Sequence, residues 1–266
     1  MTSGTIANHG SSRRFLLVHL GAAVIAAAGL LLMELTPLDR LVSDWFFDAA
    51  TRTFPLRHDF WFDVVLYHWG KKFVICIAII VLATWLLSFF VRRLRPWRRF
   101  LLFLTLAMSL APGVVVALKS SNHRSCPWDL DIYGGVAPYL KLVEVFTTPF
   151  PAGIVPTHCF PAGHAAAGFS LLALYFAGRA LQNARLAQAG LWTGIVAGAI
   201  LGAGRVAQGA HFLSHTLWTG VICWTVMVLL YVVIFEARPA GARELRAPQR
   251  NPAFSRAASA DPAQKL

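Results

Sequence analysis

Three short polar segments of the chain combine histidines with cations. They occupy residues 119–129, 158–164 and 204–215. Fixed positive charge neutralises an anion, and imidazole side chains can move protons or attack an electrophile. The residue types therefore predict a site for an anion that is flanked by reactive imidazoles.

The spacing within these segments supports the same interpretation. Lys119, Arg124 and Arg205 stand at or near the ends of apolar stretches, where a buried cation needs an anionic partner. His211 and His215 are four residues apart and share one face if that stretch is helical. Taken singly, each of these residues has an ordinary explanation, because lysines and histidines are common at membrane interfaces.

The second segment has the features of a helix start. Pro161 and Gly163 precede His164 and an apolar stretch. A helix that starts here has free N–H groups that can hold a phosphate. The alternative is that Pro161 and Gly163 only start the helix and that no ligand binds there.

The composition indicates what must position these segments. Of the 266 residues, 57% are hydrophobic and 14% are charged, which favours an integral membrane protein over soluble domains. Four cysteines, 14 prolines and 20 glycines exclude a disulfide-stapled miniprotein and a collagen. The net charge of +12 would suggest a nucleic-acid partner in a soluble protein, but no soluble domain exists here to present it. We therefore expect a membrane as partner and no nucleic acid.

Six apolar stretches have about the length of a membrane span. They cover residues 15–35, 73–91, 100–118, 165–181, 187–202 and 216–235. The fourth and fifth are rich in Ala and Gly, which favours helices packed closely inside a bundle. We therefore expect an all-α integral membrane protein, built as a six-transmembrane helix bundle.

The distribution of charge predicts the orientation of this bundle. Six spans put both termini and the loops 92–99 and 182–186 on one side. That side carries 15 of the 24 lysines and arginines but only three of the 12 acidic residues, and the opposite side carries nine of each. By the positive-inside rule the termini are cytoplasmic, so the three polar segments face the outer side.

The first outer loop, residues 36–72, contains an amphipathic pattern. Apolar residues between Leu38 and Phe46 recur at helical spacing, which predicts a helix at the outer-face interface. The alternative is an aromatic belt anchor without function. We divide the chain into a cytoplasmic N-terminal segment (1–14), a six-span domain (15–235) and a disordered basic cytoplasmic tail (236–266).

The three segments, in this order and on this side of six spans, resemble the type 2 phosphatidic acid phosphatase (PAP2) superfamily. That superfamily is related to bacterial acid phosphatases and vanadium haloperoxidases. Its pattern is Lys, six residues, Arg-Pro; then Pro-Ser-Gly-His; then Ser-Arg, five residues, His, three residues, Asp. Seven of the eleven positions match, and they are Lys119, Pro127, Pro161, Gly163, His164, Arg205 and His211. The resemblance covers about residues 15–235 when topology is included.

The resemblance implies a role for each matched residue. His211 would attack phosphorus to give a phosphohistidine, and His164 would protonate the leaving oxygen. Lys119, Arg205 and the backbone N–H of Gly163 would neutralise the phosphoryl oxygens. No metal or other cofactor is expected, because phosphoryl transfer mainly needs positioning and fixed positive charge.

Four positions depart from the family pattern. Cys126 stands where Arg is expected, Ala162 and Gly204 stand where Ser is expected, and His215 stands where Asp is expected. In the family, the Arg and the Ser next to Gly-His bind phosphate, and the Asp orients the nucleophilic histidine. These departures therefore remove two phosphate donors and one carboxylate.

Other residues are candidates to compensate. Polar side chains of the first segment could supply phosphate donors: Ser120, Ser121, Asn122 and Arg124. His215 could accept the hydrogen bond of His211, although a neutral imidazole stabilises an imidazolium less than an aspartate does. Alternatively, Asp129 or Asp131 could fold back to support His211.

Cys126 and Cys159 lie in two different outer segments beside the expected pocket. The outer compartment of a bacterium is oxidising. We predict a disulfide between them, which would tie the first segment to the second and explain why the Arg position could be given up.

The leading hypothesis is a membrane lipid phosphatase with its active site on the periplasmic face of a bacterial cytoplasmic (inner) membrane. The resemblance suggests undecaprenyl pyrophosphate, phosphatidylglycerophosphate, phosphatidic acid or lipid A as a lipid phosphate substrate. A lipid phosphotransferase would use the same residues. The Cys and His side chains also include zinc ligand types, but Lys119 and Arg205 would oppose a metal cation. A non-catalytic lipid-phosphate binder is the third alternative, because the departures remove donors.

Overall fold

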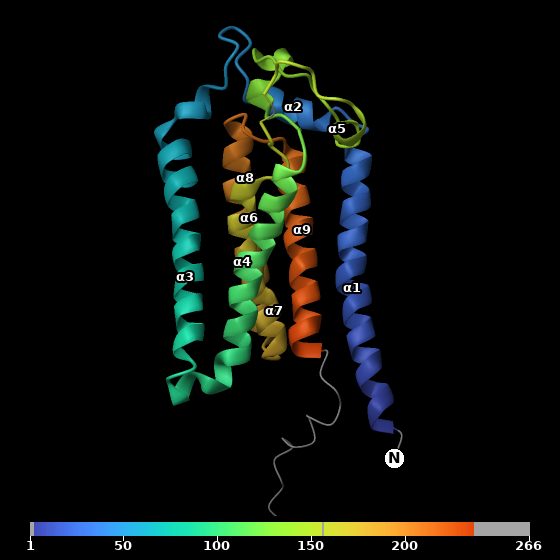
Figure 1. Cartoon of the computed structure of the whole chain (residues 1–266), viewed down its shortest axis with the longest axis vertical. Helices are drawn as coiled ribbons and strands as arrows, with labels where there is room; N and C mark the ends of the chain where they lie inside the picture. The colour runs from blue at the N-terminus through green and yellow to red at the C-terminus, as the bar shows by residue number, and fades with distance from the viewer. Residues whose placement is uncertain (1–2, 156, 237–266) are drawn as a thin grey trace, which may run out of the picture.

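The computed structural model describes residues 3–155 and 157–236, and within them it contains helices and loops but no β-strand. The helices run side by side as a bundle, and loops gather at one end of it (Figure 1). The long elements are α1 (Ser3–Met33), η2 (Trp61–Gly70) continuing into α3 (Lys71–Leu87), α4 (Arg98–Ser120), α8 (Ala184–Ala207) and α9 (Leu213–Tyr231), which continues into η7 (Val232–Glu236). A composite helix consists of α6 (Gly163–Phe169), η6 (Ser170–Leu172) and α7 (Ala173–Ala180). The all-α prediction is therefore confirmed.

Five helices in the described part of the chain are long and apolar enough to cross a membrane. They are Arg13–Met33, Trp61–Leu87, Arg92–Ser120, Ala184–Ala207 and Leu213–Glu236. The expected span at 165–181 corresponds to α6, η6 and α7, which are each too short to qualify alone. The chain is thus a membrane protein by its helices, but the count of six spans is not confirmed.

Two helices extend beyond the ranges expected from the sequence. The helix expected at 73–91 begins at Trp61, because the turns that carry Asp63 and His68 continue the helix despite their polar side chains. α1 already begins at Ser3, so the described part of the N-terminal segment 1–14 is helical. The predicted disordered tail lies, apart from Glu236, outside the described residues.

Glycines allow the composite helix to lie directly against α8. A Cβ atom added at Gly168 would lie 2.5 Å from the backbone of Ala197, and one at Gly194 would lie 2.5 Å from the backbone nitrogen of Leu172. Contacts this short are possible only without a side chain, which is how small residues bring membrane helices together. The expectation that the Ala- and Gly-rich stretches pack closely is therefore confirmed.

The short helix α2 (Leu38–Asp44) turns its polar face into the protein and its apolar face outward, the reverse of a surface helix in a water-soluble protein. Asp39 and Ser43 are buried, whereas Leu38, Leu41 and the following Trp45 are exposed, Trp45 by 78%. The polar face turns inward because Asp39 accepts hydrogen bonds from the backbone and hydroxyl of Ser214 at the start of α9. The exposed apolar face is suited to the membrane interface, as the sequence predicted for this segment.

A small hydrophobic cluster holds the loops over the end of the bundle that carries α2 and α5 (Glu144–Thr147). It contains Phe54, Leu130, Tyr133, Ala137 and Phe212. Tyr133 also donates a hydrogen bond from its hydroxyl to Asp44 at 2.7 Å. Phe212 directly follows His211, so this cluster fixes the backbone beside the third polar segment.

Candidate active site

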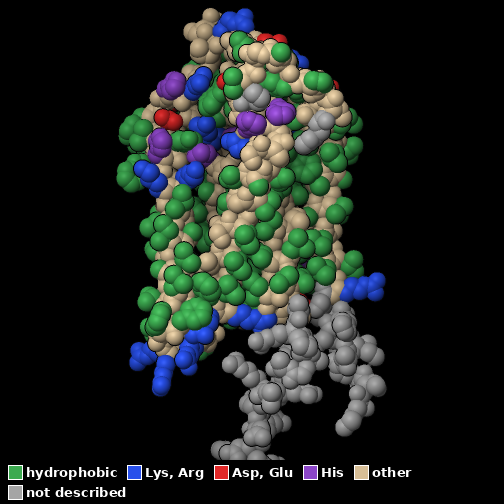
Figure 2. Space-filling model, in the orientation of Figure 1, with side chains coloured by type: hydrophobic (Ala, Val, Ile, Leu, Met, Phe, Trp, Pro, Cys, Tyr) green, Lys and Arg blue, Asp and Glu red, His purple; other side chains and the backbone are tan. Residues whose placement is uncertain are grey.

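Residues from all three polar segments line one cavity of about 310 Å³ at this end of the bundle. Its lining residues are Lys119, Cys126, Trp128, Asp129, Thr157, Cys159, Arg205, Ala210 and His211. Histidine and basic side chains gather on the same end of the molecule (Figure 2). The volume lies at the lower end of the range for small-molecule sites, which suits a headgroup more than a whole lipid.

A glycine turn at the end of α8 positions the third segment. Gly209 has a φ of +72°, which favours glycine, and its N–H donates to the carbonyl of Val206 while the N–H of Ala210 donates to that of Arg205. This Schellman-type ending stops the helix and turns the chain toward the cavity. Arg205 thus remains on the last turn of α8, and His211 lies in the connection to α9.

Arg205 is held by stacking and by one hydrogen bond. Its guanidinium carbon lies 4.4 Å from the ring centre of Tyr67 and 5.3 Å from that of Trp128, and Nη1 donates to Gln208 at 2.7 Å. Its buried Nε has no hydrogen-bond acceptor among the described residues. Neither Arg205 nor Lys119, on the last turn of α4, has a carboxylate within ion-pair distance in this part of the chain. Both cations therefore retain positive charge that an anion in the cavity could neutralise.

His211 is only 3% exposed and is surrounded by positive charge. Burial lowers the pKa of His211 well below its usual value, and the charges of Lys119 and Arg205 lower it further. The Cys159 carbonyl acts in the opposite direction as a hydrogen-bond acceptor, but its effect is smaller. His211 is therefore neutral at neutral pH, as a nucleophile must be.

His215 is fully buried on the first turn of α9, four residues after His211. The two Nδ1 atoms are 3.4 Å apart, and Nδ1 of His215 is 3.0 Å from the Cys159 carbonyl oxygen. A carbonyl only accepts hydrogen bonds, so Nδ1 of His215 carries the hydrogen in this contact. His215 therefore does not replace the missing aspartate as an acceptor at this atom.

Asn122 and a disulfide connect the first segment to the second. The amide of Asn122 donates to the carbonyls of Phe160 at 2.6 Å and Leu118 at 2.7 Å. Cys126 and Cys159 are joined by a disulfide, with their Cα atoms 5.1 Å apart. Asn122 is buried and does not line the cavity, so its contacts assign it to holding the loops rather than to binding phosphate.

Arg124 is also directed away from the cavity, contrary to the expected phosphate contact. It is 1% exposed, its Nη1 and Nη2 donate to Glu34 at 2.9 and 3.2 Å, and Nη2 lies 3.6 Å from Asp39. The sequence rule that a buried cation needs an anionic partner holds here, but the partner belongs to the protein. Arg124 therefore stabilises the loops and does not replace the donor lost at Cys126.

His164 lies on the first turn of α6, next to Tyr67 from η2. The two rings are stacked with their centres 4.1 Å apart. Burial, together with the charges of Lys71, Arg205 and Lys119, lowers the pKa of His164 to about 3. His164 is therefore neutral until an anion lies beside it, and the negative charge of a bound phosphate would favour its protonated form. His164 thus shares its electrostatic surroundings with His211, although it does not line the cavity itself.

The packing around one position explains one of the departures. A side chain at Gly204 would meet Leu66, whose Cδ2 lies 2.2 Å from the place of a Cβ. Ala162 is buried, and its N–H donates to the hydroxyl of Thr219 at 2.9 Å. Gly163, which begins α6, has open space within 4 Å of its missing Cβ but does not line the cavity.

The carboxylates that could have supported His211 are engaged elsewhere. Asp129 lines the cavity and accepts a hydrogen bond from the indole of Trp128 at 2.9 Å, while Asp131 accepts one from the backbone of Ile132. No hydrogen bond joins either of them to His211 in the described residues. Burial raises the pKa of the Asp129 carboxyl above its usual value.

One group of potential metal ligands is present among the described residues, and it consists of Cys126, Asp129 and Cys159. The two cysteines are joined to each other, so neither offers a thiolate to a metal. His164, His211 and His215 are not part of this group. Within residues 3–155 and 157–236, the geometry therefore does not assemble the zinc site that the residue types allowed.

Sequence reasoning missed two aromatic residues of the site. Tyr67 contacts both His164 and Arg205, and Trp128 lies under Arg205 and 4.2 Å from the guanidinium carbon of Arg57. Trp128 was within the first segment but had no assigned role, and Tyr67 fell in the expected outer loop. The usable signal was the aromatic and basic content of residues 57–72, directly before an apolar stretch.

A family model described as the PAP2 superfamily matches residues 100–239, slightly more than half of the chain. The matched region contains all three polar segments. No curated protein and no solved structure matches the chain with significance.

Proposed function

Because the chain belongs to the PAP2 superfamily, whose members are phosphatases, we propose that it is a phosphoester hydrolase acting on a phosphate monoester or pyrophosphate of a membrane lipid. The family and the apolar helices together support a membrane phosphatase. The lipid class, the phosphohistidine intermediate and the periplasmic location of the site on a bacterial inner membrane are part of this proposal.

One observation carries the proposal. His211, buried and neutral, opens onto a cavity together with Lys119 and Arg205, two cations without a carboxylate partner among the described residues. A neutral nucleophile next to fixed positive charge is the arrangement that phosphoryl transfer requires. A structural role would instead pair these cations with carboxylates, as Arg124 is paired.

The reaction proceeds in two displacements. Nε2 of His211 attacks phosphorus, the bond between phosphorus and the lipid oxygen breaks, and His164 gives its proton to that oxygen. Water then attacks phosphorus, His164 takes a proton from the water, the bond between phosphorus and Nε2 of His211 breaks, and inorganic phosphate leaves. Lys119 and Arg205 neutralise the charge on the phosphoryl oxygens in both steps, so the proposal needs no metal.

The Cys159 carbonyl takes over the orienting role that an aspartate has in the family pattern. It faces the imidazoles of both His211 and His215. A hydrogen bond from Nδ1–H of His211 to this carbonyl leaves Nε2 unprotonated and free to attack. A carbonyl dipole stabilises the imidazolium less than a carboxylate does, which predicts slower chemistry than a member with the aspartate.

Phosphate release by the purified, detergent-solubilised full chain tests the proposal. The panel contains phosphatidic acid, phosphatidylglycerophosphate, undecaprenyl pyrophosphate and lipid A, each with and without a chelator. His211→Ala removes the nucleophile. His58→Ala is the matched control, because His58 is an exposed histidine at the same end of the helix bundle but outside the cavity.

Release that is lost in His211→Ala, retained in His58→Ala and insensitive to the chelator supports the proposal and identifies the lipid. If the phosphoryl group is recovered on a second lipid and not as inorganic phosphate, the protein is a phosphotransferase and not a hydrolase. Release that survives in His211→Ala would overturn the assigned nucleophile. Binding of a lipid phosphate without any turnover would leave a non-catalytic binder.

A further inference from the structure

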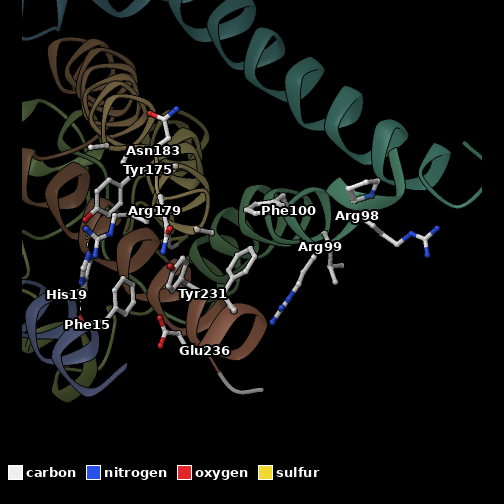
Figure 3. A pocket seen from close by; sticks show the side chains of 18 of the residues that line it. Phe15, His19, Arg98, Arg99, Phe100, Tyr175, Arg179, Asn183, Tyr231 and Glu236 are labelled. Atoms are coloured by element: carbon white, nitrogen blue, oxygen red, sulfur yellow. Dashed lines mark hydrogen bonds between the residues drawn. The ribbon is translucent and has the colours of Figure 1, made fainter. Parts of the chain in front are cut away.

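A second, larger cavity lies at the opposite end of the bundle from the candidate active site. Its volume is about 1900 Å³, and its lining residues come from α1, α3, α4, α7, α8, α9 and the turns beside them. Figure 3 shows that Phe15, His19, Tyr175, Arg179 and Tyr231 lie close together, with Phe100, Arg98 and Arg99 on the neighbouring helix. The cavity is about twice the upper size of an ordinary small-molecule site, so it can hold a headgroup together with part of its acyl chains.

The polar lining of this cavity is strongly basic. Its arginines are Arg14, Arg95, Arg98, Arg99 and Arg179. Glu236 is the one acidic residue among the residues that line it in the described part of the chain. Arg98 donates to the Ser88 carbonyl at 2.7 Å, and Arg99 donates to the Ile234 carbonyl, so these two are fixed by the fold. Arg14, Arg95 and Arg179 are exposed and have no carboxylate within ion-pair distance among the described residues.

The remaining wall is aromatic and reaches the lipid-facing surface. Arg98 lies over the ring of Phe89 at 4.2 Å, and Phe89 and Val18 are 47% and 59% exposed. Val18 lies on the membrane-spanning part of α1, where exposed apolar residues face acyl chains, and Phe89 lies in the turn just after α3. A ligand in this cavity therefore meets guanidinium groups at one part and the bilayer interior at another.

The cavity also contains a buried polar pair within the bundle. Nδ1 of His19 donates to the Phe15 carbonyl at 2.8 Å, so Nε2 must accept the hydrogen bond from the Tyr175 hydroxyl, also 2.8 Å away. The hydroxyl oxygen of Tyr175 still has acceptor capacity toward the cavity. Figure 3 shows Arg179 near this pair, and its charge acts on His19.

We propose that this basic cavity, lined by Arg14, Arg95, Arg98, Arg99 and Arg179, binds the phosphate headgroup of an anionic phospholipid, with the acyl chains along Val18 and Phe89. Arginines pair with phosphate through two parallel hydrogen bonds and are suited to this headgroup. This end of the bundle also carries the excess of positive charge that predicts the cytoplasmic side. Anionic lipids of that membrane face attract basic residues.

The chain's own C-terminal segment is a poor occupant by charge. Residues 237–266 contain six basic and two acidic residues, so they have the same sign as the cavity lining. A purely apolar ligand would leave the guanidinium groups without a counter-charge. An anionic amphiphile satisfies both parts of the lining.

A titration of the purified full chain with phosphatidylglycerol, followed by native mass spectrometry, tests the proposal. Phosphatidylglycerol has a phosphodiester, so a monoester phosphatase does not consume it. The test variant is Arg95→Gln/Arg179→Gln. The control is Arg93→Gln/Arg185→Gln, which removes the same charge from the neighbouring exposed positions outside the cavity.

The wild type and the control should bind phosphatidylglycerol equally, and the test variant should bind it about thirtyfold more weakly, the factor expected for two basic residues. Equal weakening in both variants would overturn the proposal in favour of diffuse surface charge. Equal binding of phosphatidylcholine would reduce the site to an apolar groove. Equally tight binding of soluble glycerol phosphate would make it a site for a soluble anion.

Discussion

Replacing Arg124 by Gln should strongly destabilise the protein, because it leaves two buried carboxylates without their cation. Arg124 contacts Glu34 through both terminal nitrogens and lies 3.6 Å from Asp39, and all three residues are buried. Removing one partner of a buried ion pair costs about 3–5 kcal/mol. For a domain of this size the midpoint of thermal unfolding falls by about 2–4 °C per kcal/mol, which gives a decrease of roughly 6–20 °C.

The pH dependence of this loss has a defined sign. Burial raises the pKa of Asp39 above its usual value, although Ser214 and Arg124 oppose the shift. Without Arg124 the pKa rises further, so the folded variant binds a proton that the unfolded chain binds only at lower pH. Such a group contributes stability below its unfolded pKa and loses it as the pH rises through the folded pKa. The loss in Arg124→Gln should therefore be larger at neutral than at acidic pH.

Thermal unfolding in detergent, followed by intrinsic fluorescence, measures this effect at two pH values. Arg40→Gln is the control, because Arg40 is an exposed arginine next to Asp39 on α2. Adding Glu34→Gln to Arg124→Gln should recover part of the loss, since it removes one of the unpaired charges. A midpoint for Arg124→Gln within 2 °C of the control would refute the reasoning, as would a double variant less stable than the single one.

Three further predictions follow from other parts of the structure. Reducing the disulfide, or replacing Cys126 and Cys159 by Ser, should lower kcat by about ten- to a hundredfold because the Cys159 carbonyl beside His211 and His215 is displaced; unchanged phosphate release would contradict this. The lowered pKa of His211 keeps the nucleophile neutral in mild acid, so the acidic limb of kcat/KM should lie below pH 6.5, and a limb above that value would be inconsistent with it. Gly194→Ala should cost about 1–3 kcal/mol because its Cβ meets the composite helix, whereas Gly113→Ala, where nothing lies within 4 Å, should be nearly neutral in the same unfolding assay.

Much of the fold followed from apolar periodicity and residue size. The long apolar runs predicted the helices, and the Ala and Gly content predicted the close contact that Gly168 and Gly194 make. The start at Trp61 was not predictable from hydropathy, because Asp63 and His68 interrupt the apolar run while the backbone remains helical. The partner of the polar face of α2 was also not predictable, since Asp39 accepts a hydrogen bond from Ser214, 175 residues away in the sequence.

For the site, too, the sequence predicted which segments meet but not the contacts between residues far apart in the chain. Spacing alone predicted that residues around Lys119, Arg205 and His211 meet, and one cavity contains all three. Spacing could not distinguish Arg124 from Arg205, because only the fold shows that Glu34 neutralises the former. It also could not show that the backbone carbonyl of Cys159 lies beside His211 and His215, since every residue has a carbonyl.

The most direct test of the central claim is to trap the covalent intermediate on His211. The protein is mixed with its lipid phosphate labelled in the phosphoryl group, quenched in alkali, where phosphohistidine survives, and digested for mass spectrometry. The account predicts label on the peptide that contains His211 in the wild type and in His58→Ala, and none in His211→Ala. Label on His164 or His215, or turnover without any labelled histidine, would contradict it.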